Sequence, residues 1–172
     1  MPHLKRPTFA ARHPVHVTMR LQPGVGYLRS HARAAIVEDS LRAARERLGV
    51  RIIHYSIQGN HLHLIVEAEG PDALSRAMQG LATRLARRLN ALSGRRGSVF
   101  ADRYHSHPLK TPREANRAVR YVLANHRHHT LEYLPAGWTD PLASARFTQE
   151  RPGRDAPVVA PSVWLLRVGW RL

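Results

Sequence analysis

The stretch VRIIHYSIQGNHLHLIVEAE, residues 50–69, decides the fold. Residues 50–58 and 61–69 are both rich in β-branched and other apolar side chains, which is typical of strands. Between them stands Gly59-Asn60, a dipeptide that favours tight turns. We therefore predict an antiparallel β-hairpin as the centre of the domain.

The second strand of this hairpin has two unlike faces. Alternate residues of a strand point to the same side, so Leu62, Leu64 and Val66 share one face while His61 and His63 share the other. The leucine face can bury against helices, and the histidine face must then look toward solvent or a cleft. Two imidazoles placed in this way can converge on one metal ion. They can also be two surface histidines in a chain that contains 12.

Apolar periodicity predicts the other elements on both sides of the hairpin. The expected elements are strands at 15–21 and 98–110 and helices at 31–48, within 70–97, and at 111–129. Gly49 is a plausible C-cap of the first helix, Asp72 can cap the second, and Thr111 followed by Pro112 begins the third. The order of these elements matches the split β-α-β motif. It predicts an α+β fold, a ferredoxin-like sandwich with helices packed on one face of an antiparallel sheet.

We expect three parts along the chain. Residues 1–14 are basic and irregular, residues 15–133 hold the folded domain, and residues 134–172 form a partly irregular tail rich in Pro, Gly and Arg.

Composition narrows the class of protein. The 172 residues carry 27 Lys and Arg against 12 Asp and Glu, a net charge of +15, which favours a polyanionic partner such as nucleic acid. There is no cysteine, so disulfides, Cys-type zinc sites, iron–sulfur clusters and thiol catalysis are excluded. No apolar run approaches a membrane span and no secretory signal is visible, so we expect a cytoplasmic protein without a membrane partner.

The third predicted helix brings polar groups together. Helical spacing places four of them along one side: Arg117, Tyr121, Asn125 and His128. The opposite side is more apolar, with Ala115, Val119, Val122 and His126. A phenol next to an amide oxygen, facing two metal-binding histidines, suggests a tyrosine nucleophile. The alternative is an exposed or half-buried tyrosine without a chemical role.

Taken together, these motifs resemble a known family. GNHLHLIVEAE, followed about sixty residues later by REANRAVRYVLANHRHH, is similar to the single-tyrosine HUH nucleases, and most of all to the REP-associated tyrosine transposases, relatives of the smallest insertion-sequence transposases. The similarity covers roughly residues 15–131 and includes GSVFADRYHSHPL before the third helix. The family commonly has Asn-Pro after the tyrosine, where this chain has Asn125-His126, so His126 or His128 could replace Asn125 as a ligand.

The resemblance implies a transposase-like endonuclease and strand transferase acting on single-stranded DNA near hairpins, as a monomer or homodimer. His61, His63 and Asn125 would bind one Mg²⁺ or Mn²⁺ ion, and Tyr121 would attack the scissile phosphate to give a 5′-phosphotyrosine. Arginines would hold backbone phosphates. The candidates are Arg84, Arg87, Arg88, Arg95, Arg96 and Arg117.

Three alternatives remain open. A non-catalytic single-stranded nucleic-acid-binding module on the same scaffold would share the charge and would not need Tyr121. A hydrolytic metalloenzyme would use the histidines with a carboxylate, and Glu67 and Glu69 are the acids on that strand. A domesticated transposase would still cut DNA without moving its own gene.

Overall fold

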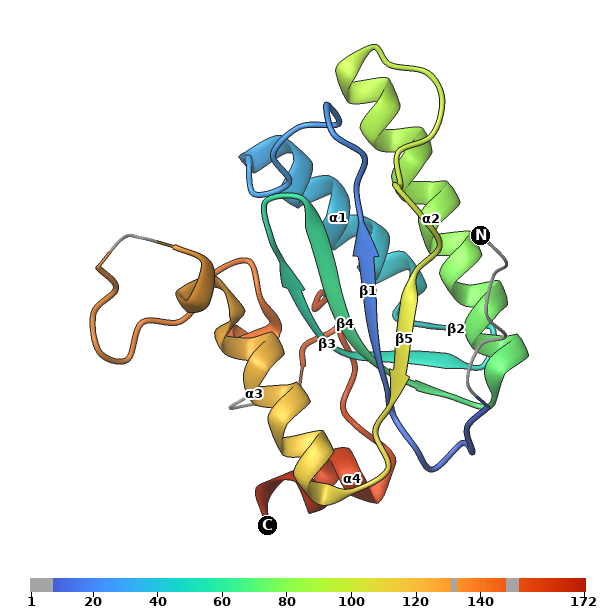
Figure 1. Ribbon diagram of the computed structural model, residues 1–172, viewed down its shortest axis with the longest axis vertical. Helices are drawn as coiled ribbons and strands as arrows, with labels where there is room; N and C mark the ends of the chain where they lie inside the picture. The colour runs from blue at the N-terminus through green and yellow to red at the C-terminus, as the bar shows by residue number, and fades with distance from the viewer. Residues whose placement is uncertain (1–7, 131–132, 148–151) are drawn as a thin grey trace.

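The predicted hairpin is present as strands β3 (Val50–Ile57) and β4 (His61–Ala68), which pair antiparallel at the centre of Figure 1. The computed structural model describes residues 8–130, 133–147 and 152–172. Of the predicted basic segment 1–14, residues 1–7 therefore lie outside the described residues.

Three more strands complete the sheet. Strand β1 (Val15–Arg20) pairs with β4 on one side and with β5 (His105–Pro108) on the other, and the short β2 (Glu46–Arg47) pairs with β3. The order is β2-β3-β4-β1-β5, and every pair is antiparallel. This order is the one expected for a ferredoxin-like sheet that carries one extra short edge strand.

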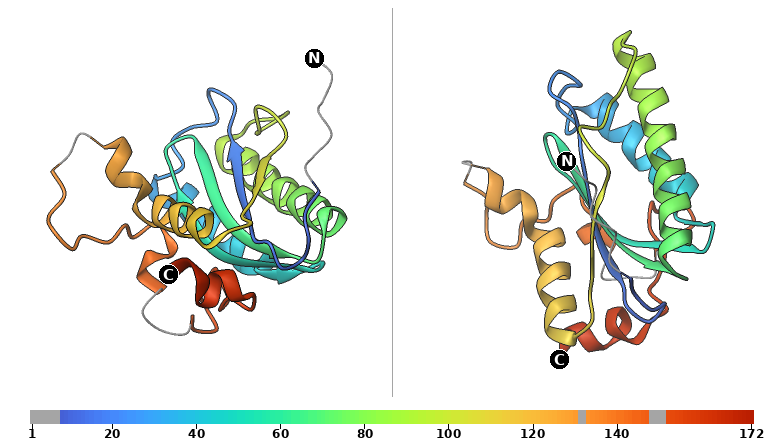
Figure 2. Two further views of the ribbon diagram at one scale, coloured as in Figure 1. Left: turned by 60° about the horizontal axis from the view of Figure 1, so that its bottom comes forward. Right: turned by 45° about the vertical axis from the view of Figure 1, so that its right-hand side comes forward.

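Helices cover both faces of this sheet (Figures 1 and 2). Helices α1 (His31–Ala44) and α2 (Pro71–Ser93) lie on one face, and α3 (Pro112–His129) lies on the other, with α4 (Trp164–Arg167) next to its first turns. The α+β class is confirmed. The prediction that all helices pack on one face of the sheet is wrong, because α3 covers the opposite face. Within the described residues no helix is long and apolar enough to cross a membrane.

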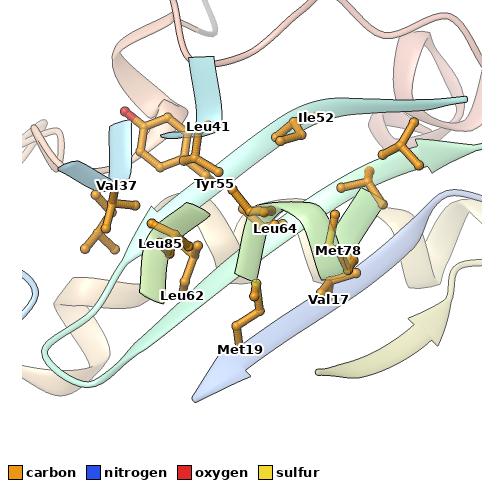
Figure 3. Close-up of a cluster of buried hydrophobic side chains, with 14 of the residues drawn as sticks. Val17, Met19, Val37, Leu41, Ile52, Tyr55, Leu62, Leu64, Met78 and Leu85 are labelled. Atoms are coloured by element: carbon orange, nitrogen blue, oxygen red, sulfur yellow. The ribbon is translucent and has the colours of Figure 1, made fainter. Parts of the chain in front are cut away.

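The main core lies between the sheet and helices α1 and α2 (Figure 3). The alternating apolar residues of β1 and β4 point into it, and α2 contributes its apolar stripe. The side chains labelled in the figure are Val17, Met19, Val37, Leu41, Ile52, Tyr55, Leu62, Leu64, Met78 and Leu85. The leucine face of the hairpin therefore buries as predicted, which directs His61 and His63 to the opposite side of the sheet.

A second, smaller core explains why α3 lies on that opposite side. Ile65 of β4 and Ile53 of β3 are buried there against Val119 and Val122 of α3. Ile53 faces α3 because it follows Ile52, whose side chain lies in the main core, and successive strand residues point to opposite faces. A β-bulge between Ile52 and His54 then shifts the β3–β4 register by one residue, so that Tyr55 returns to the main core. These apolar groups would meet water if α3 did not cover them.

The first helix ends earlier than predicted. It stops at Ala44, and Glu46–Arg47 then pairs with Arg51 and Val50 as a hairpin. Leu48 and Gly49 make its two-residue turn with φ values of 56° and 73°, so Gly49 is a turn residue and not a helix cap. Leu48, the last residue of the helix predicted at 31–48, is exposed.

The strand predicted at 98–110 is also shorter. Only His105–Pro108 forms β5, and the segment before it is a loop that touches β1 through a bridge between Leu21 and Phe100.

The segment after residue 134 packs against the sheet and α3. Asp140 forms a bidentate ion pair with Arg29 at 2.8 and 3.0 Å, and both side chains are buried. Further along, the Val159 amide donates to the Ile52 carbonyl at the β3 edge. The short helices η1 (Ser144–Phe147), α4 and η2 (Gly169–Arg171) are its regular elements.

Candidate active site

The histidine face of the hairpin is built by the register of β1 against β4. Thr18 stands opposite His63, and His16 stands opposite Ile65, so the side chains of His16 and Thr18 point to the same side of the sheet as His61 and His63. This is the side covered by α3, away from the main core.

Each of the two predicted metal ligands is held by its Nδ1 atom. Nδ1 of His63 lies 3.1 Å from Nε2 of His16 and 3.1 Å from Oγ1 of Thr18, and Nδ1 of His61 lies 2.8 Å from Oδ1 of Asn60. The two rings are 4.7 Å apart, centroid to centroid, and nearly perpendicular at 89°. A metal-binding histidine usually hydrogen-bonds through the ring nitrogen that does not bind the metal, so Nε2 is the ligand atom suited to both.

His16 stays uncharged at neutral pH. Burial away from water lowers its pKa to about 4, and the nearby His107 adds to this effect. An uncharged neighbour at 3.1 Å does not repel a cation held by His63 as a protonated ring would.

Tyr121 lies where the nucleophile was predicted. Its ring centroid is 5.3 Å from that of His63 and 6.1 Å from that of His16, and its side chain is 40% exposed. Thr111 and Glu114 position the helix that carries it, because they form a complete capping box at the start of α3. A phenol that contacts the histidines and remains open to solvent can be reached by a substrate.

Asn125 is more deeply buried than its place in the predicted polar stripe suggested. It has no exposed surface, and neither Oδ1 nor Nδ2 has a hydrogen-bond partner among the described residues. Successive residues rotate by about 100° around a helix, so each step of four drifts by about 40° and the stripe from Arg117 through Tyr121 turns inward by Asn125. Buried amides are normally hydrogen-bonded. An amide oxygen that accepts no hydrogen bond is a suitable ligand for a hard divalent cation.

Of the two substitutes for Asn125, His126 is the one whose side chain the structure describes. The ring of His126 lies 5.7 Å from that of Trp138, which directs it toward the loop after α3, and the side chain of His128 lies outside the described residues. Within the described ranges no cluster of three or more His, Asp or Glu side chains could hold a metal. His61, His63 and Asn125 therefore remain the predicted ligand set.

Of the two acids considered for a hydrolytic metalloenzyme, Glu67 is hydrogen-bonded to the C-terminal segment and Glu69 lies far along the strand from the histidines. The buried carboxylate of Glu67 accepts hydrogen bonds from Ser162 N at 2.8 Å, from Val163 N at 2.9 Å and from the Ser162 hydroxyl. It fastens the tail to β4. Glu69 lies at the other end of β4, next to Gly49.

The candidate DNA-binding arginines separate into groups. Arg84, Arg87 and Arg88 line a surface depression of about 720 Å³ on α2, and Arg88 is paired with Asp39 at 3.3 Å. Arg95 and Arg96 follow the end of α2. Helix α2, which carries the first three, lies on the face of the sheet opposite the histidines.

Arg117 is different because it lies exposed on α3, one turn before Tyr121. It is the member of the predicted set on the same side of the sheet as the histidines and the tyrosine.

The sequence analysis missed a row of polar residues beside the histidine pair. His16 and Thr18 of β1 stand opposite His107 and His105 of β5, respectively. The signals were present, because His16 and Thr18 alternate within a predicted strand and His105-Ser106-His107 repeats the spacing of His61 and His63. Strand order was needed to show that these motifs lie side by side.

A family model and two solved structures are similar to this chain. The model of the family described as Transposase IS200 like matches residues 11–125. The structure of a REP-associated tyrosine transposase bound to a REP hairpin superposes with a TM-score of 0.69 at 16% identity, covering 95% of this chain and 93% of that one.

A crystal structure of a protein from Deinococcus radiodurans R1, described as a candidate transposase, is similar with a TM-score of 0.46 at 14% identity, over 75% of this chain and 95% of that one. No functionally curated protein matches the chain. The family match spans well over half of the 172 residues and includes both the histidine pair and the tyrosine helix. The chain therefore belongs to the IS200-like transposase family, as its motifs predicted.

Proposed function

We propose that this transposase cleaves and joins single-stranded DNA near hairpins through a covalent bond between Tyr121 and a 5′ phosphate. The observation that carries the proposal is the approach of Tyr121 to His63, with 5.3 Å between ring centroids, on a face otherwise lined by His61 and His16. A binding module without catalysis would have no need for this arrangement.

His61, His63 and Asn125 would hold one divalent cation, Mg²⁺ or Mn²⁺. The unpartnered amide of Asn125 and the Nδ1-anchored imidazoles support this assignment. Such an ion, when bound, polarises the scissile phosphate and offsets the charge that develops on its oxygens.

In the reaction, the Oη atom of Tyr121 attacks phosphorus after losing its proton. The bond from phosphorus to the 3′ oxygen of the preceding nucleotide breaks, and this oxygen takes up a proton to become a free 3′-hydroxyl. The exposed guanidinium of Arg117, one turn away on α3, is suited to pair with the phosphate next to the one that is attacked. Because the phosphotyrosine keeps an ester, the 3′-hydroxyl of another strand can reverse the step and join the DNA without ATP.

The arginines of α2 would serve a different part of the DNA. They lie on the opposite face of the sheet from Tyr121, so they would bind phosphates outside the strand that is cut. Removing one of them, for example Arg84→Ala, should weaken binding and reduce its salt dependence without changing the cleavage position.

The test uses hairpin-bearing single-stranded oligonucleotides, Mn²⁺ and a denaturing gel. An oligonucleotide labelled at its 3′ end should form a slow, protease-sensitive band, and one labelled at its 5′ end should release a shorter free product. Tyr121→Phe should abolish the slow band and leave DNA binding nearly unchanged. The matched control is Tyr27→Phe, another exposed tyrosine, which should keep the band.

An adduct that persists in the Tyr121→Phe variant would show that the nucleophile is misassigned. The ligand role is tested separately with His61→Ala, which should lose Mn²⁺-dependent cleavage. Cleavage at the wild-type rate by that variant would contradict the role of His61.

A further inference from the structure

Two side chains of β1 hold the ring of His63. Nδ1 of His63 has Nε2 of His16 and Oγ1 of Thr18 at 3.1 Å each, and the His16 ring lies 5.2 Å from it, centroid to centroid. We infer that His16 and Thr18 are positioning residues: they keep the proton of His63 on Nδ1 and thereby present Nε2 as a metal ligand. This inference rests on the proposed function, in which His63 binds the cation.

The chemistry of a neutral imidazole requires such a partner. The ring carries one proton, and the nitrogen that binds a metal must be the one without it. If Nε2 is to bind, the proton must stay on Nδ1, and a buried N–H without an acceptor costs free energy. His16 Nε2 and Thr18 Oγ1 both lie within hydrogen-bond distance of that nitrogen and can accept from it.

The positions of these two acceptors are determined by the sheet. β1 is an inner strand, paired with β4 on one side and β5 on the other. Thr18 is the direct cross-strand partner of His63, and His16 is two residues earlier on the same face. The hydrogen-bonded ladder therefore sets the direction of the His63 ring before any ion arrives, which lowers the cost of binding.

The first test measures the tautomer of His63 by ¹⁵N NMR of histidine side chains in metal-free protein. We expect wild-type His63 with its proton on Nδ1. The double variant His16→Leu with Thr18→Val lacks both acceptors and should move the proton toward Nε2. His16→Gln and Thr18→Ser, which retain an acceptor, should keep the wild-type tautomer, and so should His31→Gln, a change of an exposed histidine on α1.

The second test measures Mn²⁺ affinity by electron paramagnetic resonance without DNA. Loss of both acceptors should weaken Mn²⁺ binding about 10- to 100-fold, the usual effect of removing the hydrogen-bond partners of a metal ligand. The variants His16→Gln and Thr18→Ser should recover most of the affinity. Thr18→Val alone has nearly the shape of threonine, so it provides a folded variant if the double variant is unstable.

The outcomes separate the two proposals. An unchanged His63 tautomer or unchanged Mn²⁺ affinity in the folded variants that lack acceptors would overturn the positioning role alone. Wild-type protein that binds no Mn²⁺ would overturn the proposed metal site and with it this inference. A shifted tautomer together with weaker Mn²⁺ binding would support it.

Discussion

Replacing Asn125 by leucine should stabilise the metal-free protein and abolish its metal-dependent activity. Leucine has the same number of side-chain heavy atoms as asparagine and branches at the same carbon, so it replaces the amide by two methyl groups with the same connectivity. Asn125 has no exposed surface, and neither amide atom has a hydrogen-bond partner in the part of the chain that the structure describes. Burial of an unsatisfied amide costs about 1–3 kcal/mol, which the Asn125→Leu variant should regain.

The matched control is the same substitution elsewhere in α3. The amide of Asn116 donates to the Trp170 carbonyl at 2.7 Å, so Asn116→Leu removes a hydrogen bond that is made. Such a bond contributes about 0.5–1.5 kcal/mol, and its loss should destabilise the protein. The difference in helix propensity between Asn and Leu is the same at both positions and cancels in the comparison.

The assay is thermal denaturation in the presence of EDTA, followed by cleavage of hairpin DNA with Mn²⁺. A gain of 1 kcal/mol corresponds to a rise of about 2–4 °C in Tm for a protein of this size. Asn125→Leu should therefore melt higher than wild type and fail to cleave, whereas Asn116→Leu should melt lower and still cleave. Destabilisation of the Asn125→Leu variant as large as that of the control would refute the reasoning, because it would mean that the amide already has a polar partner.

Further predictions concern stability. Asp140→Ala should cost about 3–5 kcal/mol in urea denaturation, because it leaves the buried guanidinium of Arg29 unpaired; Asp39→Ala, which breaks exposed pairs, should cost less than about 1 kcal/mol. Burial lowers the pKa of His54 to about 4, so between pH 6.5 and 4 the unfolded chain binds a proton that the folded chain does not. The free energy of unfolding should therefore fall by about 3 kcal/mol over that range through this group. Denaturation at several pH values should show a flatter dependence of stability on pH for His54→Gln than for wild type, and equal slopes in both proteins would contradict the prediction. Thr111→Ala should cost about 1 kcal/mol through loss of the α3 capping box and Thr111→Ser should not, which thermal melting would show.

Local patterns predicted most of the regular structure. The hairpin at residues 50–69 followed from two apolar runs around a turn dipeptide, and the start of α3 followed from Thr111 and Pro112. The opposite faces of β4, with Leu62 and Leu64 buried in the main core, followed from strict alternation. One error was also local. Leu48 continues the apolar helical pattern in the sequence, but in the structure Leu48 and Gly49 form a two-residue turn with positive φ, so the helix ends before them.

The composition of the candidate site was only partly visible in the sequence. His61, His63 and Tyr121 were chosen from spacing and resemblance, and the structure brings them together. His16 was passed over because nothing in its own strand shows that it lies against His63.

By itself, the sequence determined the strands and helices, the capped tyrosine helix and the two-faced hairpin, because each depends on residues within a few positions of one another. Only the tertiary structure decided that α3 covers the histidine face, that Asn125 is buried without a partner, and that the α2 arginines lie on the other side of the sheet. The physical reason is that strand order and helix packing are set by burying apolar surface between segments far apart in the chain, which no local period encodes.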